Sequence, residues 1–129
     1  MKRSISIYLM ICLCIISSCT IISANGNAMK ITKNKAIELA DIEAKKLGYD
    51  ISIMNIKADE YSTPWNEYLP KESNDQFIIE RKNKLKNKNY WAVYYYPNSE
   101  KVGIGYKGGD FCIFIDSNTG EKITDIRWK

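Results

Sequence analysis

The sequence contains no histidine, which removes both the commonest general base and the commonest metal ligand from its chemistry. Cysteine is scarce as well. The chain has four cysteines, and two of them, Cys12 and Cys14, fall in an apolar N-terminal stretch. No P-loop, nucleophile elbow or zinc-binding signature occurs among the 129 residues. We therefore predict that the chain is not an enzyme and that it carries neither a metal ion nor a cofactor.

An excess of charge of one sign is also missing. The 19 basic and 15 acidic residues give a formal net charge of +4, which falls to about +2 without Lys2 and Arg3. This value is too small for the basic surface that nucleic-acid binding requires, so we expect no nucleic acid as a partner. The hydrophobic content of 45% is typical of a globular protein, and the length allows one domain.

The N-terminal segment has the pattern of an export signal. Lys2 and Arg3 precede an uncharged apolar stretch from Ile5 to Ile16, and small polar residues follow. This order of charged, apolar and small residues is typical of a secretory signal peptide. A retained signal anchor is an alternative, because no charge occurs between Arg3 and Lys30 and one membrane span is possible there. A buried N-terminal helix is a second alternative.

The end of this segment, Ile16-Ser17-Ser18-Cys19, resembles the lipobox of bacterial lipoproteins. In that family the cysteine sulfur receives a diacylglyceryl group and the chain is cut just before it. The resemblance implies a signal peptide over residues 1–18, lipidation at Cys19 and a tether over residues 19–30. Acyl chains such as palmitate would then hold an exported protein on the membrane of the cell envelope. Gly26-Asn27-Ala28 offers small residues at which an ordinary signal peptidase could cut instead.

Such processing would leave Cys112 as the free thiol of the chain. A lipidated Cys19 cannot pair, so no intramolecular disulfide is expected despite export. Because Cys112 lies between Phe111 and Ile113, we expect it to be buried.

The sequence over residues 31–129 predicts one small α+β domain that begins with a helix over residues 33–47. Thr32 is a good N-cap, and Gly48 provides a C-terminal stop. Apolar residues recur at helical spacing between them, with charged residues on the opposite side. This stripe consists of Ala36, Ile37, Leu39, Ala40, Ala44 and Leu47.

Four segments predict strands of an antiparallel sheet, namely residues 52–60, 90–96, 111–116 and 122–128. The last two form a hairpin around a turn at residues 117–120. Aromatic and β-branched residues occupy both faces of the second segment, so we expect a central strand that is packed on one side by a helix. One face of this strand carries Tyr90, Ala92, Tyr94 and Tyr96, and the other carries Trp91, Val93 and Tyr95.

Residues 67–88 are ambiguous. Their apolar spacing favours a second helix over residues 75–86, whereas Phe77-Ile78-Ile79 alone fits a strand. This segment ends in a cluster of positive charge, for which we favour a solvated helix end, with contact to anionic lipid as the alternative. The cluster consists of Arg81, Lys82, Lys84, Lys86 and Lys88.

Three aromatic residues in the expected loop, Tyr61, Trp65 and Tyr68, are candidates for partner binding. No strand pattern requires them there, and tyrosine and tryptophan are enriched at interfaces because they combine apolar area with a polar group. The alternative is that Trp65 folds back and covers the core.

The segment Gly103-Ile104-Gly105-Tyr106-Lys107-Gly108 has the spacing of a dinucleotide-binding motif. That motif needs a helix after it, and here a strand is expected instead, so we interpret the glycines as a flexible loop. Scattered carboxylates such as Asp110 and Asp116 would be the only metal ligands, and they form no recognisable pattern.

Both ends of the mature sequence resemble PepSY-type domains. The first stretch is Ile31-Thr32-Lys33-Asn34-Lys35-Ala36-Ile37-Glu38-Leu39-Ala40, and the last is Phe114-Ile115-Asp116-Ser117-Asn118-Thr119-Gly120-Glu121-Lys122-Ile123. PepSY-type domains begin with such a helix and close with two strands around an Asp-x-x-Thr-Gly-Glu turn. The resemblance implies an inhibitory or peptide-binding module and brings no catalytic residues.

The order of elements also resembles immunity proteins of the nuclear-transport-factor-like fold, which bind and neutralise a toxin. The features that carry this resemblance are the first helix, Gly108-Gly109 before a strand, and Lys129 after a hairpin. We therefore expect a non-enzymatic, lipid-anchored module that binds a protein or peptide in the envelope, with toxin immunity as the alternative.

Overall fold

The computed structural model describes residues 29–103 and 109–128. The expected signal peptide over residues 1–18 and the lipidation residue Cys19 lie outside the described residues. The same is true of Ala28 and most of the tether, and of the glycine motif from residue 104 to residue 108.

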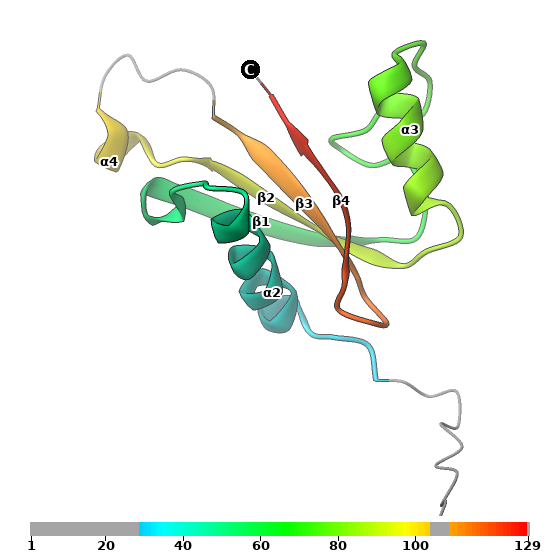
Figure 1. Cartoon of the computed structure of the whole chain (residues 1–129), viewed down its shortest axis with the longest axis horizontal. Coiled ribbons are helices and arrows are strands. Elements are labelled where there is room, and N and C mark those ends of the chain that lie inside the picture. Colours follow the sequence, from blue (N-terminus) through cyan, green and yellow to red (C-terminus); the bar gives the residue numbers. More distant parts are fainter. Residues whose placement is uncertain (1–28, 104–108, 129) are drawn as a thin grey trace, which may run out of the picture.

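Four antiparallel strands follow one another along the chain and pair in the same order, as Figure 1 shows. They are β1 (Met54–Tyr61), β2 (Tyr90–Pro97), β3 (Phe111–Asp116) and β4 (Lys122–Arg127). Strands β2 and β3 are central, and β1 and β4 form the edges. With the helices described below, this arrangement confirms the predicted α+β class and the expected sheet of four strands.

Helix α2 (Lys33–Lys46) covers one face of the sheet, packing against β1, β2 and β3. The Thr32 hydroxyl oxygen accepts a hydrogen bond from the Lys35 amide at 3.2 Å, as expected for an N-cap. Gly48 follows the helix with a φ of +84°, a conformation that glycine adopts at little cost. The side of α2 that faces the sheet is fully buried and consists of small residues, which allow a close approach; they are Ala36, Ala40 and Ala44.

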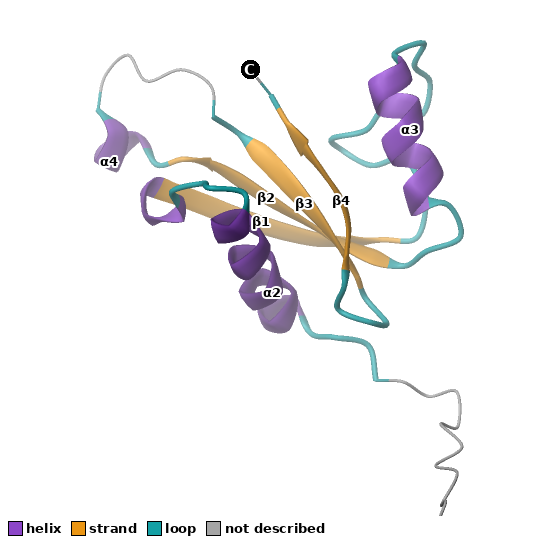
Figure 2. Ribbon diagram, in the orientation of Figure 1, coloured by secondary structure: helices purple, strands orange, loops and turns teal. Residues whose placement is uncertain are grey.

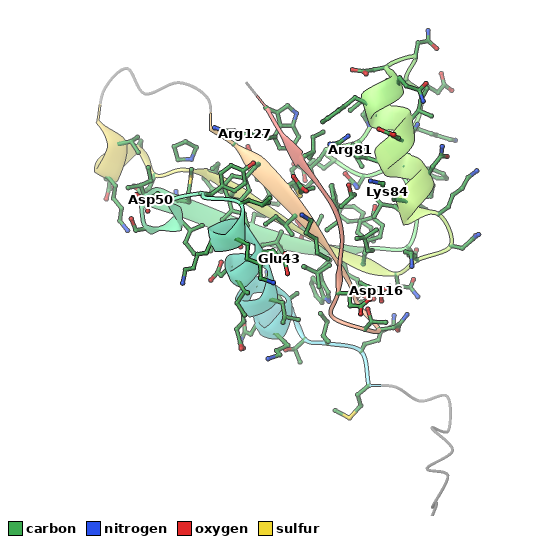
Figure 3. The ribbon with its side chains drawn as sticks, in the orientation of Figure 1. Glu43, Asp50, Arg81, Lys84, Asp116 and Arg127 are labelled. Atoms are coloured by element: carbon green, nitrogen blue, oxygen red, sulfur yellow. The ribbon has the colours of Figure 1, made fainter. Side chains whose placement is uncertain are left out.

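Helix α3 (Gln76–Leu85) packs against β4, at the edge of the sheet (Figure 2). The Asp75 carboxylate caps it by accepting a hydrogen bond from the Phe77 amide at 2.9 Å. Arg81 extends from α3 toward β4, and its Nε donates to the Asp125 carbonyl oxygen at 2.6 Å (Figure 3). The predicted helix over residues 75–86 is therefore confirmed, and the alternative of a strand at residues 77–79 is wrong.

Strands β2 and β3 separate two apolar cores. The core beneath α2 includes Val93 and Tyr95, whereas the opposite core includes Tyr90 and Ala92, as the alternation along β2 predicts. Every residue of β3 is buried, and the Cys112 side chain is fully buried as expected. The expected packing of a helix on one side of β2 is confirmed, because α2 covers that face. The second core is covered by residues of α3 and of the segment that joins β1 to α3.

Two local predictions were wrong. Residues 51–53 form a short 3-10 helix, η1 (Ile51–Ile53), rather than the start of a strand, because the Asp50 carboxylate accepts hydrogen bonds from both the amide and the hydroxyl of Ser52. Tyr61 was expected in a loop, and it is instead the last residue of β1, paired with Tyr90.

A short helix that the sequence patterns did not indicate, α4 (Ser99–Val102), follows β2. The Asn98 side chain caps it by accepting from the Glu100 amide at 3.0 Å.

The β3–β4 turn has the predicted position, and the N-terminal end of the described residues is hydrogen-bonded to it. The Asp116 carboxylate accepts hydrogen bonds from the amides of Asn118 and Thr119, and Gly120 has a φ of +76°. The Ile31 amide donates to the Ser117 carbonyl oxygen at 2.8 Å. The chain therefore enters the domain beside this turn (Figure 1).

Candidate functional site

The three aromatic residues proposed from the sequence have different surroundings. Tyr61 stacks on Tyr90, with 5.9 Å between the ring centroids. Trp65 is 40% exposed and lies under the Lys71 ammonium, so it does not cover the core as the alternative would require. Tyr68 belongs to a group of four rings, and no ring contact in the described part of the chain joins Tyr61, Trp65 and Tyr68 directly to one another.

Asn66 holds the segment that carries Tyr68 against the sheet. Its side-chain oxygen accepts hydrogen bonds from the amides of Tyr68 and Leu69 at 2.7 and 3.0 Å. Its side-chain nitrogen donates to the Tyr90 hydroxyl oxygen at 2.8 Å, and that hydroxyl donates to the Thr63 carbonyl oxygen at 2.8 Å. One asparagine therefore joins the loop backbone to a fully buried tyrosine of β2.

Four aromatic rings gather beside this segment. Tyr94 of β2 stacks on Tyr68 with 4.8 Å between centroids, and on Tyr96 with 5.5 Å. Trp128, which follows β4, meets Tyr94 edge-on at 5.9 Å and lies 6.0 Å from Tyr68. These distances between ring centroids, and the stacked and edge-on orientations of the rings, are those of attractive contacts between aromatic side chains. The rings come from three separate parts of the chain. The antiparallel pairing of β2, β3 and β4 brings Trp128 to the strand that carries Tyr94 and Tyr96, and Asn66 holds the segment that carries Tyr68.

Three of these rings, those of Tyr68, Tyr94 and Trp128, border an open pocket of about 360 Å³, which we call the aromatic pocket. Its lining residues are Glu67, Tyr68, Tyr94, Asp110 and Trp128. The walls are mainly aromatic, and two carboxylates stand at the same opening. Ligand sites commonly combine such apolar walls with a few polar groups that fix orientation.

The two carboxylates of the aromatic pocket differ in their partners. Glu67 is exposed and forms an ion pair with Lys57, with 2.8 Å between Oε2 and Nζ. Asp110 is half-buried, and its Oδ2 accepts a hydrogen bond from the Tyr94 hydroxyl. Among the described residues, no lysine or arginine forms a salt bridge with Asp110. Glu67 thus has a counter-ion, Lys57, which also lies 3.7 Å from Asp59, whereas Asp110 has none in the described part of the chain.

Both tyrosines of the pocket remain neutral at physiological pH. Burial, followed by the hydrogen bond to Asp110, raises the pKa of Tyr94 to about 12. Burial raises the pKa of Tyr68 well above its ordinary value of 10. The Tyr68 hydroxyl is also buried without a hydrogen-bond partner among the described residues, which costs free energy. Tyr94 therefore acts as a hydrogen-bond donor toward Asp110, and Tyr68 acts as an aromatic wall.

Three basic side chains of the positive cluster expected at the end of α3 make contacts within the domain. Arg81 donates to a β4 carbonyl and lies over the Phe77 ring at 3.3 Å. The Lys82 ammonium donates to the carbonyl oxygens of residues 70 and 71. Lys88 lies 3.6 Å from the Asp116 carboxylate, at a pocket whose lining mixes acidic and basic residues. Figure 3 shows Lys84 on α3 and Asp116 at the β3–β4 turn.

Sequence reasoning missed Tyr94, Asp110 and Trp128 as members of one site. Tyr94 was assigned to one face of its strand, Trp128 was only included in the strand over residues 122–128, and Asp110 was considered only as a scattered carboxylate. The available signal was the antiparallel order of the last three strands, since it places the start of β3 beside the end of β4. Indeed the Trp128 amide donates to the Asp110 carbonyl oxygen at 3.1 Å.

Comparison of the chain with protein-family models, curated proteins and solved structures gives no match. Within residues 29–103 and 109–128, no helix combines the length and the apolar character needed to cross a membrane. In the same described part of the chain, no three acidic or cysteine side chains lie together in a way that could hold a metal ion.

Proposed function

We propose that the protein is an exported, lipid-anchored binding module of the bacterial cell envelope that takes a protein or peptide partner at the aromatic pocket. The observation that carries this proposal is the gathering of Tyr68, Tyr94 and Trp128 around an opening with two carboxylates. The leader and the lipobox-like sequence ending at Cys19 support export and anchoring.

The aromatic pocket has the physical properties of a binding surface. Its rings are half-buried, so a partner that covers them removes further apolar area from water, at about 25 cal/mol per Å². Tyrosine and tryptophan are also frequent among the residues that contribute most to binding energy. Because Tyr94 belongs to a central strand and Tyr68 is held by Asn66, little ordering is required when a partner binds.

The position of the aromatic pocket suits a module that is tethered at its N-terminus. The chain enters the domain at Ser117, after the last residue of β3, whereas Asp110 precedes the first residue of β3. At about 3.4 Å per residue, a strand of this length separates the two points by roughly 20 Å. An anchor at Cys19 would therefore attach the domain at the end with the β3–β4 turn, with the aromatic pocket at the opposite end of β3.

Fatty-acid labelling tests the anchor. We expect Cys19→Ala to abolish incorporation of an alkyne-tagged palmitate probe and to release the protein from the membrane fraction, because the acyl chains provide the attachment. Cys14→Ala, which changes a leader cysteine outside the lipobox-like sequence, is the matched control and should be labelled normally. Unchanged labelling of Cys19→Ala would refute the anchor.

Photo-crosslinking in intact cells tests the binding site. A benzophenone amino acid at Tyr96, which is 37% exposed and stacks on Tyr94, should give a discrete crosslinked product. The same group at Ile42, an exposed residue of α2, is the control and should not. Adding Trp128→Ala should remove the product at position 96. Crosslinks of equal yield at both positions would contradict a partner at the pocket, and a toxin as the captured partner would indicate immunity instead.

A further inference from the structure

We infer that the aromatic pocket binds an arginine side chain of its partner polypeptide. This inference rests on the proposed function and adds the chemistry of the group that is recognised. Its basis is the half-buried Asp110 carboxylate beside aromatic rings that have no cationic partner within residues 29–103 and 109–128.

The Asp110 carboxylate has capacity for a cationic ligand. From the described residues it accepts one side-chain hydrogen bond, donated by the Tyr94 hydroxyl, and an ionised carboxylate can accept about four. Removing a charge from water without a counter-ion costs free energy, and a cation bound at the pocket would offset that cost. Glu67 adds little to this attraction, because Lys57 already pairs with it at 2.8 Å.

The aromatic rings favour the same type of ligand. A cation over the face of a tyrosine or tryptophan ring is attracted by the negative π face. Three such contacts occur elsewhere in the domain, including Arg81 over Phe77 at 3.3 Å and Lys71 over Trp65 at 5.3 Å. None of the three involves a ring of the aromatic pocket, so among the described residues these rings have no cationic partner.

Arginine fits this combination better than lysine. Its planar guanidinium can stack on one ring while its fork of N–H groups binds a carboxylate with two parallel hydrogen bonds. The same division of roles is visible in Arg81, which stacks on Phe77 and donates Nε to a carbonyl oxygen of β4. The aromatic pocket offers an equivalent ring and, in Asp110, a stronger acceptor because it is charged.

The experiment measures binding of short blocked peptides to the purified full chain by ¹⁵N NMR, following the indole N–H signal of Trp128. The probes are acetyl-Gly-Gly-Arg-Gly-Gly-amide and the same peptide with citrulline, which has nearly the same shape and no charge. We expect a dissociation constant of about 1 mM for the arginine peptide and at least roughly tenfold weaker binding of the citrulline peptide. Binding should also weaken as the salt concentration rises.

Variants locate the effect. Asp110→Asn keeps an oxygen for the Tyr94 hydroxyl and should bring the two peptides to within about twofold of each other, because the charge is lost. Glu72→Gln, an exposed acidic residue outside the pocket, is the matched control and should bind like the unmodified chain. The NMR spectrum itself shows whether each variant is folded.

The outcomes separate this inference from the proposed function. Equal binding of arginine and citrulline peptides, no binding of either, or unchanged selectivity in Asp110→Asn would overturn the inference. Binding of N-acetylglucosamine oligomers in place of the arginine peptide would also overturn it and assign the pocket to a glycan. If crosslinking at Tyr96 succeeds in cells while the arginine peptide fails, the proposed binding site stands and only the chemistry of its ligand is wrong.

Discussion

Removing one hydroxyl group, in Tyr90→Phe, should weaken both the fold and the aromatic pocket. Tyr90 is fully buried in the core opposite α2. Its hydroxyl donates to the Thr63 carbonyl oxygen and accepts from the Asn66 side chain, each at 2.8 Å. Phenylalanine fills the same space, so the substitution removes the two hydrogen bonds without creating a large cavity.

The expected loss of stability follows from these two bonds. A neutral hydrogen bond contributes about 1 kcal/mol, and leaving a buried partner unsatisfied costs about 1–3 kcal/mol. Because Thr63 and Asn66 are only partly buried, water can replace some of what is lost. We therefore expect Tyr90→Phe to lower the free energy of unfolding by roughly 2 kcal/mol, a large share of the 5–15 kcal/mol typical of a small domain.

Urea unfolding of the purified protein measures this change. With a slope near 1.5 kcal/mol per molar urea, the midpoint should fall by roughly 1 M while the slope stays the same. Tyr96→Phe is the matched control, because its side chain is 37% exposed and its hydroxyl makes no hydrogen bond among the described residues, so it should cost well under ~1 kcal/mol. If Tyr90→Phe costs no more than Tyr96→Phe, the hydrogen bonds of Asn66 do not hold the loop as we argue.

Three further changes test other parts of the structure. Tyr68→Phe should raise the free energy of unfolding by about 1 kcal/mol in the same urea assay, because the buried Tyr68 hydroxyl has no hydrogen-bond partner among the described residues. A clear loss of stability would show that this hydroxyl does have a partner. Gly120→Ala should lower the free energy of unfolding, measured by thermal unfolding, by about 1–2 kcal/mol, and by more than Gly48→Ala does. Both glycines have a positive φ, but at Gly120 the new Cβ would also lie 3.0 Å from a methyl group of Leu39 in α2, whereas at Gly48 it would meet no atom within 4 Å. The free energy of unfolding should keep its full value below pH 10 and fall as pH rises toward 12. The reason is that burial raises the pKa of Tyr90 and of Tyr94 to about 12 in the folded state, above the value near 10 of the unfolded chain. The loss is on the order of 2 kcal/mol for Tyr90, and a flat profile from pH 9 to 12 by circular dichroism would refute it.

Much of the fold was predictable because its signals are local. The N-cap Thr32, the alanine stripe and Gly48 lie within one segment of sequence, and together they place α2 to within one residue of its observed end. The alternation along β2 likewise identifies which side chains face each core. Such patterns depend on the chain's own periodicity and need no knowledge of distant contacts.

The errors occurred where a side chain competes with the backbone or where pairing is long-range. Asp50 binds Ser52 and holds residues 51–53 in a 3-10 turn, although the isoleucines there alternate as in a strand. Tyr61 extends β1 because it is paired with Tyr90, which lies 29 positions further along the chain. Residues such as Pro64 and Trp65 gave no information about where that pairing would stop.

The aromatic pocket could not be predicted for a related reason. Its residues lie at positions 67, 68, 94, 110 and 128. The register of the β2–β3 and β3–β4 pairs brings the last three together, and the hydrogen bonds of Asn66 hold the segment that carries the first two. Each residue alone had an ordinary interpretation, such as strand face or loop. Tyr68 was proposed from the sequence because no strand pattern requires an aromatic residue there, and the structure places it in the pocket lining; partner binding by Tyr68 stays a prediction.

The two sides of the sheet also differ in how they are covered, and this difference places the pocket in the less stable part of the domain. Beneath α2 the sheet meets a continuous stripe of buried alanines. On the other side, the segment between β1 and α3 lacks regular structure and is held by Leu69 and by the hydrogen bonds of Asn66. Segments with few buried apolar contacts open at lower free energy than the core. Substitutions in residues 62–75 should therefore weaken binding at the aromatic pocket before they unfold the sheet, and native-state hydrogen exchange should show the amides of Tyr68 and Leu69 exchanging well before those of β3.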